Sequence, residues 1–243
     1  MRQFTIRALL GFIVVMLFSI TMAHAVNPYT YVPKNAIKYL PILDDQVSKF
    51  FTDFPDYAYF GGLIEQESCI ALTYHSCWNP KTQLLTSREQ GAGLAQLTRA
   101  FRKDGSVRFD SLEAIREQHM KELKDLSWSN ILVRPDLQMR AMILMSKDNY
   151  KRLYMVPKPI DRIAFTDSAY NGGLSGLFRD RRLCGLMLDC DPNIWFGNVE
   201  RTCSKSKAPI YGHESPCDIN RTHVSNILKI RMKKYAKYMK MRH

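Results

Sequence analysis

Apolar residues recur every three or four positions along nearly the whole chain, and this spacing limits the possible folds more than any other feature of the sequence. Because an α-helix has 3.6 residues per turn, the spacing places apolar side chains along one face of a helix. The sequence therefore predicts a mainly α protein. The expected helices lie at about residues 42–51, 57–68, 111–126, 136–154, 161–171 and 219–241.

Two stretches depart from the helical pattern. Residues 82–110 are less helical in their spacing and leave room for a small β-hairpin. Residues 184–217 are polar, rich in turn formers and contain four cysteines, so we expect an irregular region pinned by disulfides. We interpret this region as part of a single domain that spans residues 26–243.

The N-terminus has the pattern of an export signal. Arg2 and Arg7 give the segment a basic start, and an uncharged apolar run follows over residues 8–20. Ala23-His24-Ala25 then supplies the small residues of a signal-peptidase site. The alternative is a retained membrane anchor, but residues 8–25 are marginal for a helix that needs about 20 apolar residues to span a bilayer. We expect residues 1–25 to be removed and the protein to be periplasmic or secreted.

All six cysteines follow the export segment, at positions 69, 77, 184, 190, 203 and 217. An even number of cysteines in an exported chain predicts disulfides, although six cysteines allow 15 pairings. The spacings include no C-x-x-C motif, and the chain has no H-E-x-x-H motif, so we expect neither a metal site nor a cofactor.

The chain is strongly basic, with a formal net charge of +12. Much of the excess lies in the last predicted helix, which includes Lys233, Lys234 and Lys237, and no acid follows Asp218. A solvated basic helix face is one interpretation. The other is electrostatic association with a polyanion such as the cell wall or an anionic surface. Nothing in the sequence resembles a nucleic-acid-binding motif.

One carboxylate falls on the apolar face of the predicted helix at 57–68. Phe60, Leu63, Ile64 and Glu67 are spaced to share that face, whereas Glu65 points elsewhere and should be dispensable. Loss of hydration favours the protonated form of a carboxyl group, which is the form that general-acid cleavage of a glycosidic bond requires. The alternative is that Glu67 lies at the helix end and reaches water.

Four short segments, in order along the chain, support the catalytic interpretation of Glu67. Gln66-Glu67-Ser68 is followed by Trp78-Asn79-Pro80, then by Gly-Ala-Gly-Leu-Ala-Gln-Leu-Thr at 91–98, and then by Ala-Tyr-Asn-Gly-Gly at 169–173. In this order they resemble the glutamate-serine, G-L-M-Q and A-Y-N-A-G motifs of the soluble lytic transglycosylases. The resemblance covers about residues 44–182 and implies a lysozyme-like fold.

The resemblance also implies an activity and a set of site residues. Members of the family cleave peptidoglycan between N-acetylmuramic acid and N-acetylglucosamine and leave a 1,6-anhydro-muramoyl end. By position, Glu67 would be the catalytic acid and base, and Ser68 would steady it or the neighbouring sugar. Gln96 would hydrogen-bond the glycan, Tyr170 would donate its hydroxyl toward Glu67, and Asn171 would line the cleft.

The chain also departs from the family pattern. Ala95 replaces the methionine of G-L-M-Q, Gly172 replaces an alanine, and the region from residue 183 onward matches poorly. Residues 69–77 form an extra segment beside the catalytic helix, flanked by Cys69 and Cys77. We predict that these two cysteines pair and close a short loop, and that the other four pair within residues 184–217.

Two other functions compete with the lytic transglycosylase. A goose-type lysozyme or chitinase-like hydrolase would share the fold but needs a second carboxylate to activate water. Between Glu67 and Gly93 the only acid is Glu89, followed later by Asp104 and Asp110. The third possibility is a catalytically inactive glycan-binding module, which the joint presence of the motif glutamate, glutamine and tyrosine disfavours.

The export signal makes a direct prediction. We expect the exported protein to begin at Val26, because Ala23 and Ala25 meet the small-residue requirement of signal peptidase. N-terminal sequencing of the exported form tests this, and a start before Ala23 would contradict it.

Overall fold

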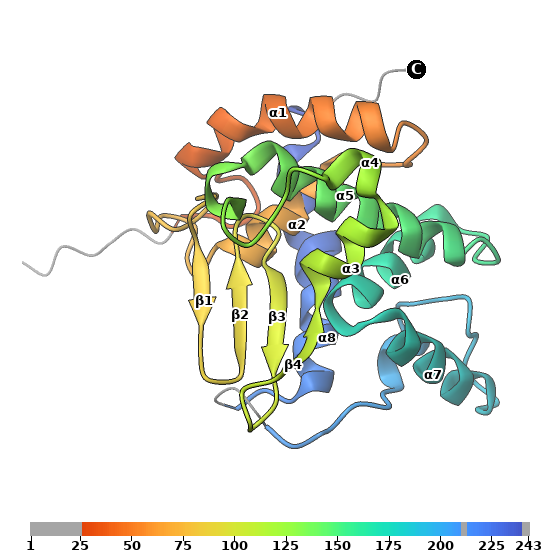
Figure 1. Cartoon of the computed structure of the whole chain (residues 1–243). Helices are drawn as coiled ribbons and strands as arrows, with labels where there is room; N and C mark the ends of the chain where they lie inside the picture. The colour runs from red at the N-terminus through yellow and green to blue at the C-terminus, as the bar shows by residue number, and fades with distance from the viewer. Residues whose placement is uncertain (1–25, 210–212, 240–243) are drawn as a thin grey trace, which may run out of the picture.

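The computed structural model describes residues 26–209 and 213–239 (Figure 1). The chain is about 52% helical, with one small antiparallel sheet, which confirms the mainly α prediction. The predicted signal peptide and its alternative, a membrane anchor, lie outside the described residues. Among the helices that are described, none is long and apolar enough to cross a membrane.

The helices follow the predicted periods but differ from them at their ends. The observed helices are α1 (Lys34–Phe50), α2 (Ala58–Ser68), α3 (Ser111–Gln118), α4 (Met120–Leu123), α5 (Pro135–Arg152), α6 (Pro159–Gly172), α7 (Leu174–Gly185) and α8 (Pro216–Ser225), with short 3-10 turns η1 (Ile131–Val133) and η2 (Val199–Arg201). Helix α7 was not predicted. One continuous cluster of buried apolar residues extends from Ala36 in α1 to Met239.

The expected small hairpin is a four-stranded sheet. Its strands are β1 (Gln83–Leu85), β2 (Glu89–Ala92), β3 (Leu97–Phe101) and β4 (Val107–Asp110). They pair in sequence order, each antiparallel to the next. In Figure 1 the sheet lies on the opposite side of the molecule from α6 and α7, with α2 and α8 between them.

The prediction of a single regular helix at 219–241 is wrong within the described residues, which end at Met239. Helix α8 continues into a π-helical turn, η3 (Asn226–Arg231), and a 3-10 turn, η4 (Met232–Tyr235). The segment is not a solvated basic face throughout either, because the side chain of Lys234 is only 2% exposed. Lys233 and Lys237 are exposed. The change of helical pitch lets this segment follow the surface of α2.

Helix α2 is buried on several faces by the C-terminal segment. A Cβ atom on Gly61 would lie 2.6 Å from Cγ of Tyr235, and one on Gly62 would lie 2.9 Å from the backbone nitrogen of Met232. Both distances are far too short for a real contact, so only glycine permits this approach. The two glycines therefore let η3 and η4 pack directly against the backbone of α2.

The close approach explains the position of Glu65, which the sequence interpretation had wrong. Its side chain is fully buried, and Oε1 lies 2.9 Å from Nη1 of Arg231 and 2.8 Å from Nζ of Lys234. The hydroxyl of Tyr235 donates to the other carboxylate oxygen and accepts a hydrogen bond from Trp78. Glu65 points into the interface between α2 and the C-terminal segment, where two cations compensate its charge.

Three disulfides confirm the predicted pairing. Cys69 bonds to Cys77, and the remaining bridges are Cys184–Cys190 and Cys203–Cys217. The first closes the extra segment next to the end of α2. The other two hold the region between α7 and α8, as expected for chain with little regular structure.

The Glu65 network makes a prediction about stability. Glu65→Gln removes the charge that compensates Arg231 and Lys234, so we expect the free energy of unfolding to fall by about 3 kcal/mol or more. Urea unfolding measures this loss. The matched control is Glu117→Gln on the exposed side of α3, which should change the free energy by less than about 0.5 kcal/mol. Equal stabilities for the two variants would contradict the structural role of Glu65.

Candidate active site

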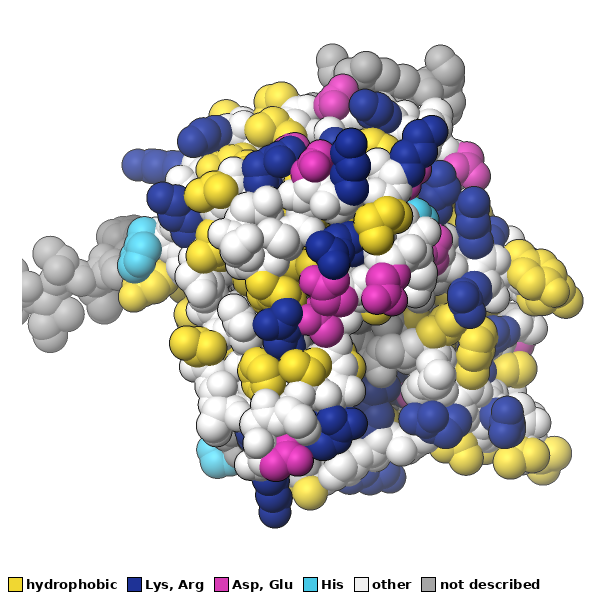
Figure 2. Space-filling model, viewed as in Figure 1, with side chains coloured by type: hydrophobic (Ala, Val, Ile, Leu, Met, Phe, Trp, Pro, Cys, Tyr) yellow, Lys and Arg dark blue, Asp and Glu magenta, His cyan; other side chains and the backbone are white. Residues whose placement is uncertain are grey.

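A cleft of about 770 Å³ opens between the sheet and the C-terminal end of α6. Figure 2 shows the surface hollowed between the sheet and α7, with Lys and Arg side chains around the hollow. Gln96, Tyr170 and Asn171, which come from motifs far apart in the sequence, all line this cleft. The structure thus brings three of the five predicted site residues to one place.

Glu67 occupies the last turn of α2, and its side chain is 16% exposed. Glu67 is not among the residues that line the cleft. Its charge nevertheless interacts with Tyr170, which does line the cleft. Burial raises the pKa of the Tyr170 hydroxyl well above its usual value, and the charges of Glu67 and then Asp167 add to the rise. Glu67 therefore lies close enough to Tyr170 for their electrostatic interaction, without itself lining the cleft.

A chain of hydrogen bonds holds the Glu67 carboxylate. Its Oε1 lies 2.8 Å from Nε2 of His223, and Nδ1 of the same ring lies 2.8 Å from Oδ2 of Asp167. The other oxygen of Asp167 accepts a hydrogen bond of 3.0 Å from the hydroxyl of Tyr59. The chain connects α2, α6 and α8, and Asp167 and Tyr59 are fully buried within it.

The two carboxylates determine the charge of His223. Burial alone lowers the pKa of this imidazole, but the charge and hydrogen bond of Asp167, together with those of Glu67, outweigh burial and raise the pKa to about 10. His223 is therefore an imidazolium at neutral pH, with one N–H donated to each carboxylate. One of the two protons thus lies between Nε2 of His223 and Oε1 of Glu67.

Tyr170 differs from what the family resemblance implies. Its hydroxyl donates to the carbonyl oxygen of Ala95 at 2.7 Å, not to Glu67. The acceptor belongs to the turn before β3, so Tyr170 ties α6 to the wall of the cleft across from it. The hydrogen-bond partner of Glu67 is His223, a residue that the sequence interpretation did not select.

Ser68 is also engaged inside the protein. Its side chain is buried, and its hydroxyl donates to the carbonyl of Ile64 at 2.7 Å and accepts from the backbone N–H of Trp78 at 3.1 Å. This hydroxyl holds the disulfide-closed loop against the end of α2. The Ser68 hydroxyl thus stabilises the chain next to Glu67, and its hydrogen bonds are made inside the protein.

The turn that carries Gln96 is shaped by Gly93 and Gln138. Gly93 has a φ of 76°, and a Cβ there would lie 2.4 Å from the Gln138 side chain, which is buried and accepts from the N–H of Leu94. Gln96 itself has a φ of 42°, and its amide donates to the carbonyl of Gly93 at 2.8 Å. The turn thus holds the Gln96 side chain at the edge of the cleft.

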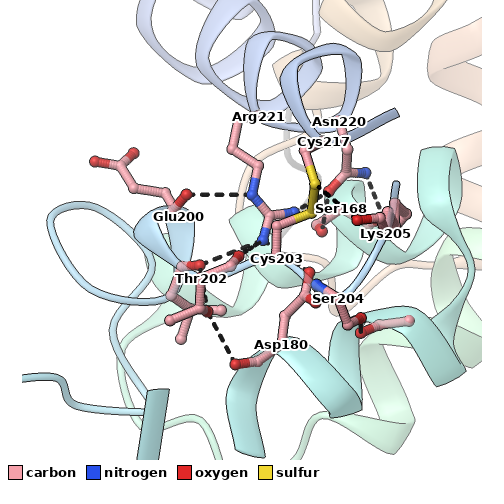
Figure 3. A network of polar contacts seen from close by, with 12 residues as sticks. Ser168, Asp180, Glu200, Thr202, Cys203, Ser204, Lys205, Cys217, Asn220 and Arg221 are labelled. Atoms are coloured by element: carbon pink, nitrogen blue, oxygen red, sulfur yellow. Dashed lines mark hydrogen bonds and ion pairs between the residues drawn. A yellow bond between two sulfur atoms is a disulfide. The ribbon is translucent and has the colours of Figure 1, made fainter. Parts of the chain in front are cut away.

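Asn171 belongs to a second network that orients α8. Its side-chain oxygen accepts from Nδ2 of Asn220 at 2.9 Å, and Asn220 also bonds to Ser168. Arg221 lies beside Asn220 (Figure 3). It forms an ion pair of 2.7 Å with Asp180 of α7 and contacts the loop that carries Thr202. These contacts fix the first turns of α8 and so fix the direction of His223, which lies less than one turn further on.

Lys205 adds a cation to the cleft wall. It lines the cleft next to Gly172, and its Nζ atom is buried without a hydrogen-bond partner among the residues that the structure describes. Burial lowers the pKa of this lysine, and Asp180 opposes the shift. An anionic group in the cleft would compensate this charge.

The candidate second carboxylates differ in position. Glu89 lines the cleft. Asp104 is exposed and bonds to Ser106 in the turn after β3, and Asp110 is paired with Arg99 and caps α3. Of these three acids, Glu89 alone is placed to face a ligand in the cleft.

No group of three or more His, Cys, Asp or Glu side chains within the described ranges is arranged to hold a metal ion. Comparison of the chain with protein-family models, with curated proteins and with solved structures finds no match. The chemical interpretation of the site therefore depends on its own geometry and on the sequence motifs.

The sequence contains a signal for the burial of His223. Asn220, His223, Val224 and Ile227 recur at helical spacing, so the imidazole falls on the buried face of α8. A histidine on such a face needs a polar partner. Which partner it meets depends on how α8 packs on α2 and α6, and no local pattern encodes that.

The raised pKa of His223 predicts a pH dependence of stability. Its folded pKa of about 10 exceeds the ordinary value of 6.5, so the stabilisation is complete below pH 6.5 and is lost as the pH rises toward 10. The free-energy difference between wild type and His223→Gln should therefore be larger at pH 6 than at pH 10, by on the order of a few kcal/mol. Urea unfolding at the two pH values measures it.

The control for this experiment is the exposed His75, whose replacement by glutamine should give the same small difference at both pH values. A His223→Gln effect that does not change with pH would contradict a charged imidazolium between Glu67 and Asp167.

Proposed function

We propose that the chain is a lytic transglycosylase that cleaves peptidoglycan glycan strands with Glu67 as acid and base. The observation that carries the proposal is the hydrogen-bonded chain Asp167–His223–Glu67 beside a cleft lined by Gln96, Tyr170 and Asn171. A carboxylate in such a position has a proton at hand and is largely shielded from water. The mainly α architecture with a small sheet flanking the cleft is compatible with the lysozyme-like fold that the motifs imply.

The proposed reaction uses one movable proton. In the first step the glycosidic bond between C1 of the muramoyl sugar and the leaving oxygen breaks, and Glu67 gives that oxygen a proton while His223 becomes neutral. In the second step the 6-hydroxyl of the same sugar attacks C1 and loses its proton to Glu67, which restores the hydrogen-bonded pair. Asp167 keeps the imidazole oriented through its hydrogen bond with Nδ1. Intramolecular attack benefits from proximity, so no second carboxylate has to position a water.

A hydrolase is the second candidate, and Glu89 is the observation that favours it. Glu89 lines the cleft together with the predicted substrate-binding residues. If it positioned water on the far side of the sugar, the same cleft would release hydrated ends. An inactive glycan-binding module is less well supported, because a binding module has no need for a buried proton chain at the carboxylate.

The setting of the proposed activity is outside the cytoplasm, in the periplasm or in the secreted state. Three disulfides fit an oxidising compartment. The part of the C-terminal segment that remains available for the wall is smaller than the sequence suggested, since Lys234 and Arg231 are committed to Glu65. Electrostatic association through this segment would depend on exposed residues such as Lys233 and Lys237.

The proposal predicts the result of replacing single carboxylates. Glu67→Gln keeps the shape of the side chain but cannot cycle a proton, so cleavage of purified peptidoglycan should slow by about 10²- to 10⁴-fold or more. Glu89→Gln should retain most activity, and Glu117→Gln, at an exposed residue that does not line the cleft, should retain all of it. Product release from purified peptidoglycan measures these rates.

Mass spectrometry of the products distinguishes the mechanisms. Muramoyl ends lighter by one water than lysozyme products are expected. Hydrated reducing ends together with a large loss for Glu89→Gln would establish the hydrolase instead, and intact peptidoglycan after incubation with wild-type protein would leave only glycan binding.

A further inference from the structure

A second hollow, of about 630 Å³, lies where α1, α4 and α5 meet. It shares no lining residue with the cleft beside Glu67. Five cationic side chains line it: Lys49, Lys121, Arg140, Lys147 and Lys151. Figure 2 shows Lys and Arg side chains gathered over α1 and α4, on the side where this basic pocket lies.

Two of the cations are fixed in place by contacts with the protein. Nε and Nη1 of Arg140 donate to the side chain of Gln46 and to the carbonyl of Glu122, both at 2.9 Å, and its guanidinium lies 4.6 Å from the ring centre of Phe50. Nζ of Lys147 donates to the carbonyl of Phe50 at 2.6 Å. The two cations on the floor of the basic pocket are therefore preorganised.

The acids around the basic pocket do not balance this charge. Asp148 is already paired with His119 at 2.7 Å, which leaves Glu122 as the other carboxylate of the lining. Lys49, Lys121 and Lys151 are exposed and form no ion pair within the described ranges. Their mutual repulsion is relieved when an anion binds between them.

The geometry favours a phosphate group over a carboxylate. One arginine fork satisfies a planar carboxylate, whereas the tetrahedral oxygens of a phosphate accept donors from several directions at once. Here donors approach from three helices around a hollow that is larger than one phosphate. The space fits a phosphate with a further polar group attached, such as a phospholipid headgroup.

Exposed apolar side chains lie close to the basic residues in the sequence. Met120 precedes Lys121 and is 51% exposed, and Tyr154 and Met155 follow the last turn of α5, beyond Lys151, at 72% and 67%. Cations next to exposed aromatic and apolar side chains are suited to a bilayer surface, where the cations meet headgroups and the apolar groups enter the interface.

From these observations we propose that the basic pocket between α1, α4 and α5 binds the phosphate headgroup of an anionic phospholipid and docks the exported protein on a membrane surface. This inference does not depend on the proposed enzymatic activity, since the two sites share no residue.

The experiment measures co-sedimentation of the exported form of the protein with vesicles of phosphatidylcholine alone or with phosphatidylglycerol added. The test variant is Lys121→Gln/Lys151→Gln, and the matched control is Lys233→Gln/Lys237→Gln, which removes the same charge from exposed positions of the C-terminal segment. Tyr154→Ser/Met155→Ser removes the apolar contribution. Unchanged thermal unfolding verifies that each variant is folded.

We expect wild type to bind only the vesicles that contain phosphatidylglycerol. The pocket variant should lose at least about tenfold in affinity, since each basic residue near an anionic surface contributes several-fold, and the control variant should lose much less. The apolar variant should weaken vesicle binding while leaving its salt dependence unchanged. Equal losses in the pocket and control variants would show diffuse attraction to a basic protein and overturn the proposal. Binding of inorganic phosphate in the pocket without vesicle binding would also overturn it, in favour of a free-phosphate site.

Discussion

Burial of two carboxylates on α2 is the constraint on which the rest of this structure depends. Glu65 loses all of its contact with water and Glu67 most of it when the helix is covered, and each then requires a positive partner. The C-terminal segment supplies both partners: Arg231 and Lys234 for Glu65, and His223 for Glu67. The glycines at 61 and 62 allow the backbones to come close enough for these contacts, and the irregular pitch of η3 and η4 keeps the segment on the helix.

The same constraint accounts for the elements around the site. Helix α8 can present His223 to Glu67 only if its first turns are held, and the Arg221 and Asn220 networks, with the Cys203–Cys217 bridge, hold them against α6 and α7. The Cys69–Cys77 loop and the Ser68 hydroxyl fix the other end of α2. The regions with the least regular structure thus determine the geometry around the carboxylate.

Local patterns in the sequence predicted part of this arrangement. Helical spacing predicted most helices, and the cysteine positions predicted the Cys69–Cys77 bridge and the pairing of the other four cysteines within residues 184–217, because both depend on residues close together in the chain. The same spacing misjudged Glu65, since a helix covered on more than one side has no single apolar face to reveal its neighbours. His223 and the buried role of Lys234 could not be predicted either, because their partners on α2 lie more than 150 residues away and meet them only through tertiary packing.

The hydrogen-bonded chain from Asp167 through His223 also changes the environment that Glu67 requires as a proton donor. A lone carboxylic acid holds its proton near neutrality only when burial disfavours its charge strongly, and that burial would also limit access for a glycan. In this chain Glu67 shares a proton with the imidazolium of His223, which removes this conflict. Asp167 and Glu67 together raise the pKa of His223 to about 10, and the side chain of Glu67 remains partly exposed. The tyrosine of the motif is then free for another contact, and Tyr170 uses its hydroxyl to join α6 to the opposite cleft wall at Ala95. In this chain the poorly matching C-terminal region thus takes over, through His223, the contact to Glu67 that the motifs assign to the tyrosine.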